Sequence, residues 1–270
     1  MNTLSYVKKT RLAKPWIYFL ATYAWTWSFF GVAYLKGMSA ESGQVLGVIL
    51  VLLAVSGPAV MGIIFTYLSL NREGQKDYWK RIIDFKRISF KWYLVIFFLI
   101  PVVTIIAAIL SGYWEMYSFS HKLPSLYLTI LSVPLVPIFE ELGWRGYALD
   151  RLQEKYSAVT SSLILGALWG PWHLPAFFLQ GSIFGLMSFL SLTFWLYMIN
   201  TVAITVCFTW IYNNTGRSTL SAILFHIVLE FCANTGLIPW DRSEHVYNVA
   251  LWIIIAIILT YRYSSTLKLT

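Results

Sequence analysis

The sequence has few charged residues. Only 12% of its 270 residues are Asp, Glu, Lys or Arg, whereas 58% are hydrophobic and 18% are aromatic. A soluble globule of this length needs more polar surface than such a composition provides. The composition therefore argues against an ordinary soluble domain and favours a membrane protein with several spans.

Cysteine is also scarce. Cys207 and Cys232 both lie in apolar segments, and neither belongs to a CxxC pattern or to a Cys/His ligand spacing. A disulfide framework and a zinc ribbon are therefore not indicated, and we expect two buried thiols. The sequence also lacks an HExxH motif, an internal repeat and any linker long enough to separate two domains.

Long apolar runs, in contrast, occupy most of the chain. Crossing a hydrocarbon core of ~30 Å takes roughly 20 residues. Eight segments meet this requirement, at about residues 16–35, 46–70, 91–111, 129–149, 159–180, 186–212, 218–238 and 247–263. We therefore expect an all-α bundle of about eight transmembrane helices, formed by residues 1–270 as one integral-membrane domain in a lipid bilayer.

The positive charges predict how this bundle is oriented. If the N-terminus is cytoplasmic, only Lys36, Lys122 and Arg242 of the 20 lysines and arginines fall in outer segments. Cytoplasmic loops are enriched in Lys and Arg, so we expect both termini to face the cytoplasm and place the protein in the cell membrane. The net charge of +8 is then explained by topology and anionic headgroups, and no nucleic-acid partner is expected.

Five ionisable residues interrupt the apolar segments of the second half, namely Glu140, Glu141, Arg145, His173 and His226. Such groups are costly at membrane depth and usually mark a functional site. Glu141 and Arg145 are four residues apart, so they can form an intrahelical ion pair, which is more often structural than catalytic. Glu140 is rotated by about 100° from Glu141, and a desolvated carboxylate there suits a general base.

The histidine at 173 also predicts a local distortion. A lone histidine in an apolar helix is usually a packing residue, and helix depth places His173 deeper than Glu140 and His226. Gly170, Pro171 and Pro175 surround it. Because proline removes a backbone donor and disturbs the helical ladder, we expect the helix to be broken near His173.

Three short motifs carry a resemblance to a known family. The chain reads EELGWR at 140–145, WGPWH at 169–173 and FHIVLE at 225–230. Their order, spacing and membrane placement resemble the EExxxR, aromatic-xxx-His and His-containing motifs of the CAAX prenyl protease and bacteriocin-processing family, the CPBP or Abi intramembrane proteases. The resemblance covers about residues 130–234.

This resemblance implies an eight-helix endopeptidase with a cytoplasm-facing cavity. Glu140 and His173 match the residues that activate a water for attack on a peptide bond. His226 matches the histidine that, with an Asn or Asp four residues later, holds the oxyanion or has been described as a metal ligand. The substrate implied is a peptide or a membrane protein, and nothing in the sequence decides whether it is prenylated.

Position 230 departs from this pattern because it is a glutamate. An ionised Glu230 cannot donate a hydrogen bond to an oxyanion, so it must be protonated, act as a ligand, or stand aside. Asn234, one turn further along the helix, is a candidate replacement donor.

A metal ion is an open question at this stage. Glu140, His173 and His226 come from separate segments and form an acceptable set of zinc ligands. The same three groups also suffice for a metal-free mechanism, in which the carboxylate and one imidazole move protons and the other imidazole donates to the oxyanion.

Two other classes of protein share some of these features. A secondary transporter also places carboxylates and histidines at mid-bilayer, although it should show a repeated topology. A membrane scaffold or bacteriocin immunity protein would retain the fold without keeping all the catalytic residues. The glutamate at position 230 leaves this alternative open. The remaining histidines, His121 and His245, fall in predicted outer loops, where we expect them to be solvated.

Overall fold

The computed structural model describes residues 14–37, 45–112, 133–179, 188–234, 245–263 and 266–268. The elements of this part of the chain are helices, as predicted. The first half contains α1 (Pro15–Leu35), α2 (Val45–Val55), α3 (Gly57–Ser69), α4 (Arg72–Ile83), η4 (Phe85–Arg87) and α5 (Phe90–Ser111). The second half contains α7 (Leu135–Gly143), η8 (Trp144–Ala148), α8 (Leu149–Gln153), α9 (Ala158–Trp172), η9 (Leu174–Phe178), α10 (Leu192–Asn214), α11 (Thr219–Asn234) and α12 (His245–Tyr263).

Three of the described helices, α5, α10 and α12, are long and apolar enough to cross a membrane alone. Helices α2 and α3 form a fourth candidate span, bent by 44° at the break between them. The other predicted spans coincide with helices that are shorter or less apolar, such as α11 with 16 residues. The apolar helices indicate an integral membrane protein, whereas the number of about eight spans stays a prediction.

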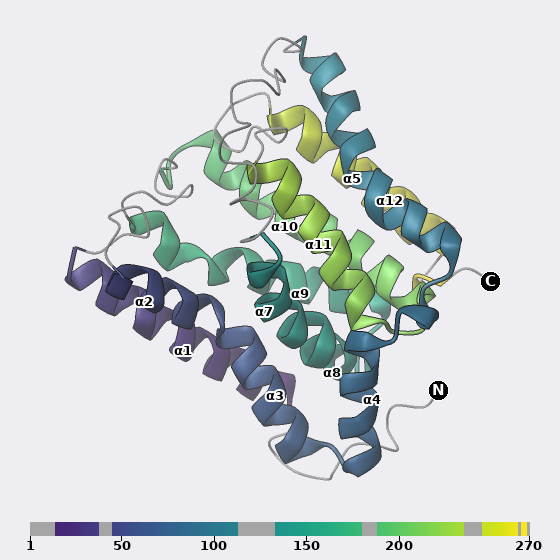
Figure 1. Cartoon of the computed structure of the whole chain (residues 1–270). Coiled ribbons are helices and arrows are strands. Elements are labelled where there is room, and N and C mark those ends of the chain that lie inside the picture. Colours follow the sequence, from purple (N-terminus) through teal and green to yellow (C-terminus); the bar gives the residue numbers. More distant parts are fainter. Residues whose placement is uncertain are drawn as a thin grey trace.

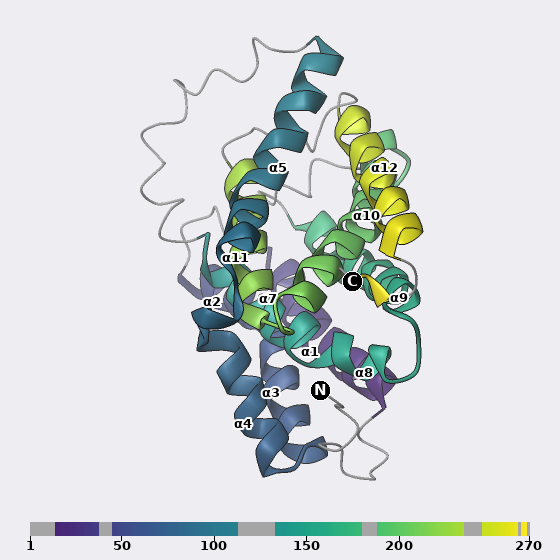
Figure 2. The same cartoon turned by 90° about the vertical axis from the view of Figure 1, so that its right-hand side faces the viewer.

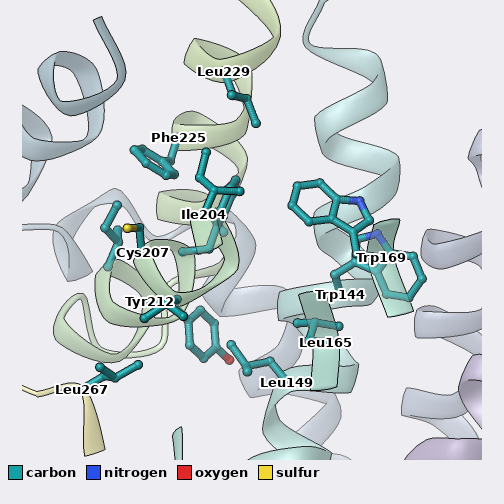
Figure 3. Packing of buried hydrophobic residues seen from close by; sticks show 14 of the residues in the cluster. Trp144, Leu149, Leu165, Trp169, Ile204, Cys207, Tyr212, Phe225, Leu229 and Leu267 are labelled. Atoms are coloured by element: carbon teal, nitrogen blue, oxygen red, sulfur yellow. The ribbon is translucent and has the colours of Figure 1, made fainter. Parts of the chain in front are cut away.

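The helices lie in three groups (Figures 1 and 2). Helices α1, α2 and α3 pack together on one side, and α5 and α12 lie side by side on the opposite side. Helices α7, α9, α10 and α11 lie between these groups. One large cluster of buried hydrophobic side chains joins them, and Figure 3 shows Phe225 and Cys207 on one side of this core and Trp144 and Trp169 on the other. Both cysteines are buried thiols outside any disulfide, as predicted.

Glycine allows α7 to lie directly against α3. A Cβ atom added to Gly143 would lie 2.2 Å from the carbonyl oxygen of Pro58, and one added to Gly62 would lie 2.9 Å from the Cα of Gly143. Small residues permit this kind of backbone contact between membrane helices. The contact fixes the end of α7 that carries Glu140 and Glu141.

Two irregular segments flank the predicted motifs. Helix α7 continues through η8, which is a π-helical turn, into α8. Helix α9 contains Pro171 and ends at Trp172, and the chain continues as a 3-10 helix from Leu174. The predicted break at His173 is therefore confirmed.

A buried ionic cluster fastens one end of the bundle. Asp150 of α8 accepts hydrogen bonds from Arg81 of α4, from Arg217 before α11, and from Tyr212 of α10 at 2.9 Å. Arg217 and the preceding Gly216 both have left-handed backbone conformations, with φ of 60° and 62°, which gives a sharp turn between α10 and α11. The ends of four helices thus meet at the side of the molecule that holds several of the predicted inner segments.

Candidate active site

Glu140 is buried on the last turn of α7 and held by two indole groups. Its Oε2 accepts hydrogen bonds from Trp169 Nε1 at 2.6 Å and from Trp144 Nε1 at 3.3 Å. Figure 3 shows these two indoles next to each other. Oε2 is occupied in this way, and the other oxygen, Oε1, faces His173.

His173 lies at the end of α9, directly opposite Glu140. Its Nδ1 is 2.9 Å from the carbonyl oxygen of Trp169. A carbonyl only accepts, so Nδ1 carries the proton and Nε2 of the neutral ring presents its lone pair. This Nε2 is 4.0 Å from Glu140 Oε1. That separation is too long for a direct hydrogen bond and suits a bridging water.

Glu141 points to a different set of partners, as its rotation from Glu140 predicts. Its Oε1 accepts from Arg145 Nη1 at 2.6 Å, which confirms the expected ion pair. The same oxygen accepts from His226 Nδ1 at 2.8 Å. The Glu141–Arg145 ion pair therefore does more than stabilise the end of the helix, because Glu141 also fixes the His226 ring. The guanidinium of Arg145 lies 3.9 Å from the ring centroid of Phe208, fully buried.

Glu230 follows His226 by one turn and lies on the same side of α11. Its Oε1 is 3.7 Å from His226 Nε2, and its side chain is 28% exposed. Asn234 is exposed, and its Nδ2 donates to the backbone oxygen and to Oε2 of Glu230. In this structure Asn234 thus contacts the site through Glu230, and its role as a replacement donor stays a prediction.

A small cavity of about 40 Å³ lies between α9, α10 and α11. His173, His226 and Glu230 line it, together with Tyr197, Asn200 and Trp169. The volume exceeds the roughly 10–15 Å³ that a water needs. The cavity thus brings the second and third motifs together, and Glu140 is joined to it through His173 and Trp169.

Sequence reasoning missed several residues of this site. Trp169 is part of the WGPWH segment, four residues before His173, and that spacing was the available signal for a contact on the same helical face. Trp144 lies in EELGWR at the same spacing from Glu140. Tyr197 and Asn200 belong to α10, where no motif surrounds them.

Glu140, His173 and His226 are not arranged as a set of metal ligands in this structure. Within that part of the chain, no group of three or more His, Cys, Asp or Glu side chains is arranged to hold a metal ion. The hydrogen bonds are consistent with this result, because Glu140 Oε2 is occupied by two indoles and His226 Nδ1 by Glu141.

The two histidines expected in outer loops have different outcomes. His245 is fully buried at the start of α12, so the prediction that it is solvated was wrong. The helix begins at His245 itself, and its first residue packs into the protein. His121 lies outside the described residues.

Two comparisons with known proteins bear on this arrangement. A family model described as Type II CAAX prenyl endopeptidase Rce1-like matches residues 122–232. The chain is also 30% identical over 263 residues to CAAX prenyl protease 2 of Methanococcus maripaludis, a match that covers 92% of this chain and 93% of that protein.

The chain belongs to the Rce1-like family of CAAX prenyl endopeptidases. It is accordingly a CAAX-type endopeptidase, and a protein of this family acts on a membrane-associated protein substrate. The match to the Rce1-like family model includes all three motifs and Glu230. Family membership favours this reading over the transporter and scaffold alternatives.

Proposed function

We propose that this protein hydrolyses a peptide bond of a membrane-associated substrate with a water activated by Glu140 and His173. The observation that carries the proposal is the buried pair Glu140 Oε1 and His173 Nε2, separated by 4.0 Å. A water at hydrogen-bonding distance from both atoms fits this gap. The name of the relative from M. maripaludis suggests a prenylated protein with a C-terminal CAAX sequence as substrate.

The mechanism begins with removal of a proton from this water by Glu140. As the water oxygen forms a bond to the carbonyl carbon, the carbonyl π electrons move to its oxygen and create a tetrahedral oxyanion. The carbon–nitrogen bond then breaks, and the proton held by Glu140 passes to the departing amine. His173 orients the water through Nε2, and the Trp169 indole keeps the carboxylate directed at it.

His226 is proposed to act on the substrate oxygen. Glu141 fixes its ring through Nδ1, so that Nε2 faces the cavity beside Glu230. Because Nδ1 carries the proton donated to Glu141, Nε2 also carries one only in the imidazolium form, and that Nε2–H can donate to the oxyanion. Arg145 supports this arrangement by sharing the Glu141 oxygen, and it does not itself reach the cavity lining.

The proposal can be tested by replacing Glu140 with Gln. Loss of a general base usually costs about 10²–10⁴-fold in rate, so Glu140→Gln should lower cleavage of a farnesylated CAAX peptide on that scale while preserving the folded state. The exposed Glu73 of α4 provides the matched control, Glu73→Gln. Cleavage by Glu140→Gln at the wild-type rate would refute the proposed base.

The involvement of zinc can be tested separately. Glu140, His173 and His226 remain the ligand set to examine if a metal takes part. The residues alone support a metal-free reaction, so we expect cleavage to survive prolonged dialysis against a chelator. Loss of activity that returns with added zinc would instead assign these three residues to a metal, as four-coordinate zinc with a bound water activates hydrolysis.

A further inference from the structure

Asn200 of α10 is a buried polar residue with an unpaired side-chain oxygen. Its side chain is 2% exposed, and its Oδ1 has no hydrogen-bond partner in the described part of the chain. The neighbouring threonines of the same helix are all satisfied: Thr201, Thr205 and Thr209 each donate to the carbonyl four residues earlier. Buried polar groups are normally paired, so an exception calls for an explanation.

The position of Asn200 provides that explanation. It lines the same cavity as His173, His226 and Glu230. The cavity is only about 40 Å³, so a group bound there touches residues from all three of its helices. Its unpaired Oδ1 is an acceptor, but Oδ1 and Nδ2 exchange places when the side-chain amide turns by 180°. Asn200 can therefore present its two N–H donors to a group in the cavity.

Most other donors of the cavity already have acceptors. Trp169 Nε1 donates to Glu140, His226 Nδ1 donates to Glu141, and Thr201 Oγ1 donates to a backbone carbonyl. Glu230 presents carboxylate oxygens, which accept hydrogen bonds and repel an anion when ionised. A substrate oxygen that becomes negative during hydrolysis therefore needs a donor other than the residue one turn after His226.

We propose that Asn200 is a catalytic residue whose Nδ2 donates a hydrogen bond to the oxyanion, supplying from α10 the amide that α11 lacks at Glu230. This inference rests on the proposed hydrolysis by Glu140 and His173. The oxyanion forms when the water oxygen bonds to the carbonyl carbon, and its charge disappears when the carbon–nitrogen bond breaks. A donor aimed at this atom lowers the barrier because it binds the transition state more strongly than the substrate.

The first test measures kcat and KM for a quenched farnesylated CAAX peptide. Asn200→Ala should lower kcat by about 10²–10³-fold with little change in KM, as for the loss of an oxyanion donor. Asn200→Asp keeps the shape of the side chain and should also be impaired. The control is Asn248→Ala: Asn248 is equally buried, its amide has no partner among the described residues, and it is not among the residues that line the cavity.

A rescue experiment distinguishes an oxyanion donor from a packing residue. Glu230→Asn places an amide beside His226, so the double variant Asn200→Ala with Glu230→Asn should regain at least about tenfold in kcat over Asn200→Ala alone. Affinity for a peptide aldehyde, whose hydrate mimics the tetrahedral species, should fall in Asn200→Ala. Affinity for the uncleaved peptide, measured in a Glu140→Gln background, should not change.

The outcomes separate this inference from the function on which it rests. An unchanged cleavage rate in Glu140→Gln would refute the proposed hydrolysis by Glu140 and His173. Loss of activity in Glu140→Gln together with a wild-type kcat in Asn200→Ala would overturn only the role of Asn200. Unfolding of both Asn200→Ala and Asn200→Asp in detergent, or failure of Glu230→Asn to restore any activity, would assign Asn200 to packing.

Discussion

A single carboxylate oxygen links the first and third motifs. Oε1 of Glu141 accepts from both Arg145 and His226, so the position of the His226 ring depends on a charge pair that is fully buried. Two buried charges are costly to desolvate, and they are tolerated here because each neutralises the other. At the scale of the residue, the Glu141–Arg145 ion pair therefore holds the His226 ring in position.

The variant Arg145→Ala tests this role of the ion pair. Removal of one partner of a buried ion pair typically costs roughly 3–5 kcal/mol, so the free energy of unfolding in detergent should fall on that scale. Arg72→Ala, at an exposed position of α4, should change it by less than about 0.5 kcal/mol. A variant of Arg145 with wild-type stability and no cleavage would show instead that the guanidinium takes part in the chemistry.

The sequence allowed only part of the site to be predicted. Glu140, His173 and His226 were recognisable because ionisable groups stand out in apolar segments and because the three motifs occur in family order. Asn200 gave no such signal, since one asparagine in a long helix has no local context that reveals its neighbours. Its position at the cavity is set by the packing of α10 against α9 and α11.

At the scale of the element, α7 depends on its contact with α3. Gly143→Ala would place a methyl group 2.2 Å from the Pro58 carbonyl oxygen, which neither backbone can avoid. We expect destabilisation by roughly 1–3 kcal/mol together with reduced cleavage, because the displaced helix carries Glu140. The control is Gly31→Ala in α1, where an added Cβ meets nothing within 4 Å and should leave both properties unchanged. Equal behaviour of the two variants would contradict the close-contact argument.

The helices themselves were predicted more accurately than their ends. The break after Trp172 followed from two prolines and a glycine, which act locally. The π-helical turn at Trp144–Ala148 carries no proline and was not expected. Residues far apart in the sequence, Tyr78 and Thr219, pack around Gly146 in this turn, and a local pattern does not reveal such tertiary contacts.

At the scale of the whole molecule, the ionic cluster around Asp150 predicts how stability depends on pH. Burial alone would raise the pKa of Asp150, but Arg217 and Arg81 outweigh it and hold this pKa well below its ordinary value. The resulting stabilisation is complete above the unfolded pKa of about 3.9 and is lost as the pH falls through the folded pKa.

Asp150→Asn should therefore be less stable than the wild type at pH 7, by up to roughly 3–5 kcal/mol, because Arg81 and Arg217 lose one carboxylate partner and keep only Asp77. The difference should narrow below about pH 4, where the Asp150 carboxylate of the unfolded chain begins to take up a proton while that of the folded protein stays ionised. Thermal unfolding in detergent between pH 7 and 3 measures both quantities. Asp84→Asn, which removes a partly exposed carboxylate with a 3.6 Å contact to Arg87, is the control with a small expected change. A stability difference between the wild type and Asp150→Asn that stays constant from pH 7 to pH 3 would contradict a stabilising role of the ionised Asp150.

The orientation of the molecule is a further prediction at this scale. Both native cysteines are buried, so single cysteines introduced at exposed sites can be labelled selectively. On intact cells, an impermeant maleimide should modify Lys36→Cys at the end of α1, whereas Lys80→Cys in α4 should react only after permeabilisation. The reverse labelling pattern would show that the topology is inverted.

With the expected topology, His226 lies about 10 Å along α11 from its inner end, so a substrate must enter the bilayer to reach it.

The π-helical turn between Glu141 and Asp150 sets the phase between two remote anchor points. One end of this continuous helix must aim Glu140 at His173 and Glu141 at His226, and the other must aim Asp150 at three donors. A π turn contains one more residue than an α turn needs, and a single residue corresponds to about 100° of rotation. Deletion of Ala148 would preserve the side chains that contact Glu140, Glu141 and Asp150 and would still turn the two ends out of register. The number of residues in this segment is therefore under stricter constraint than the identity of most of them.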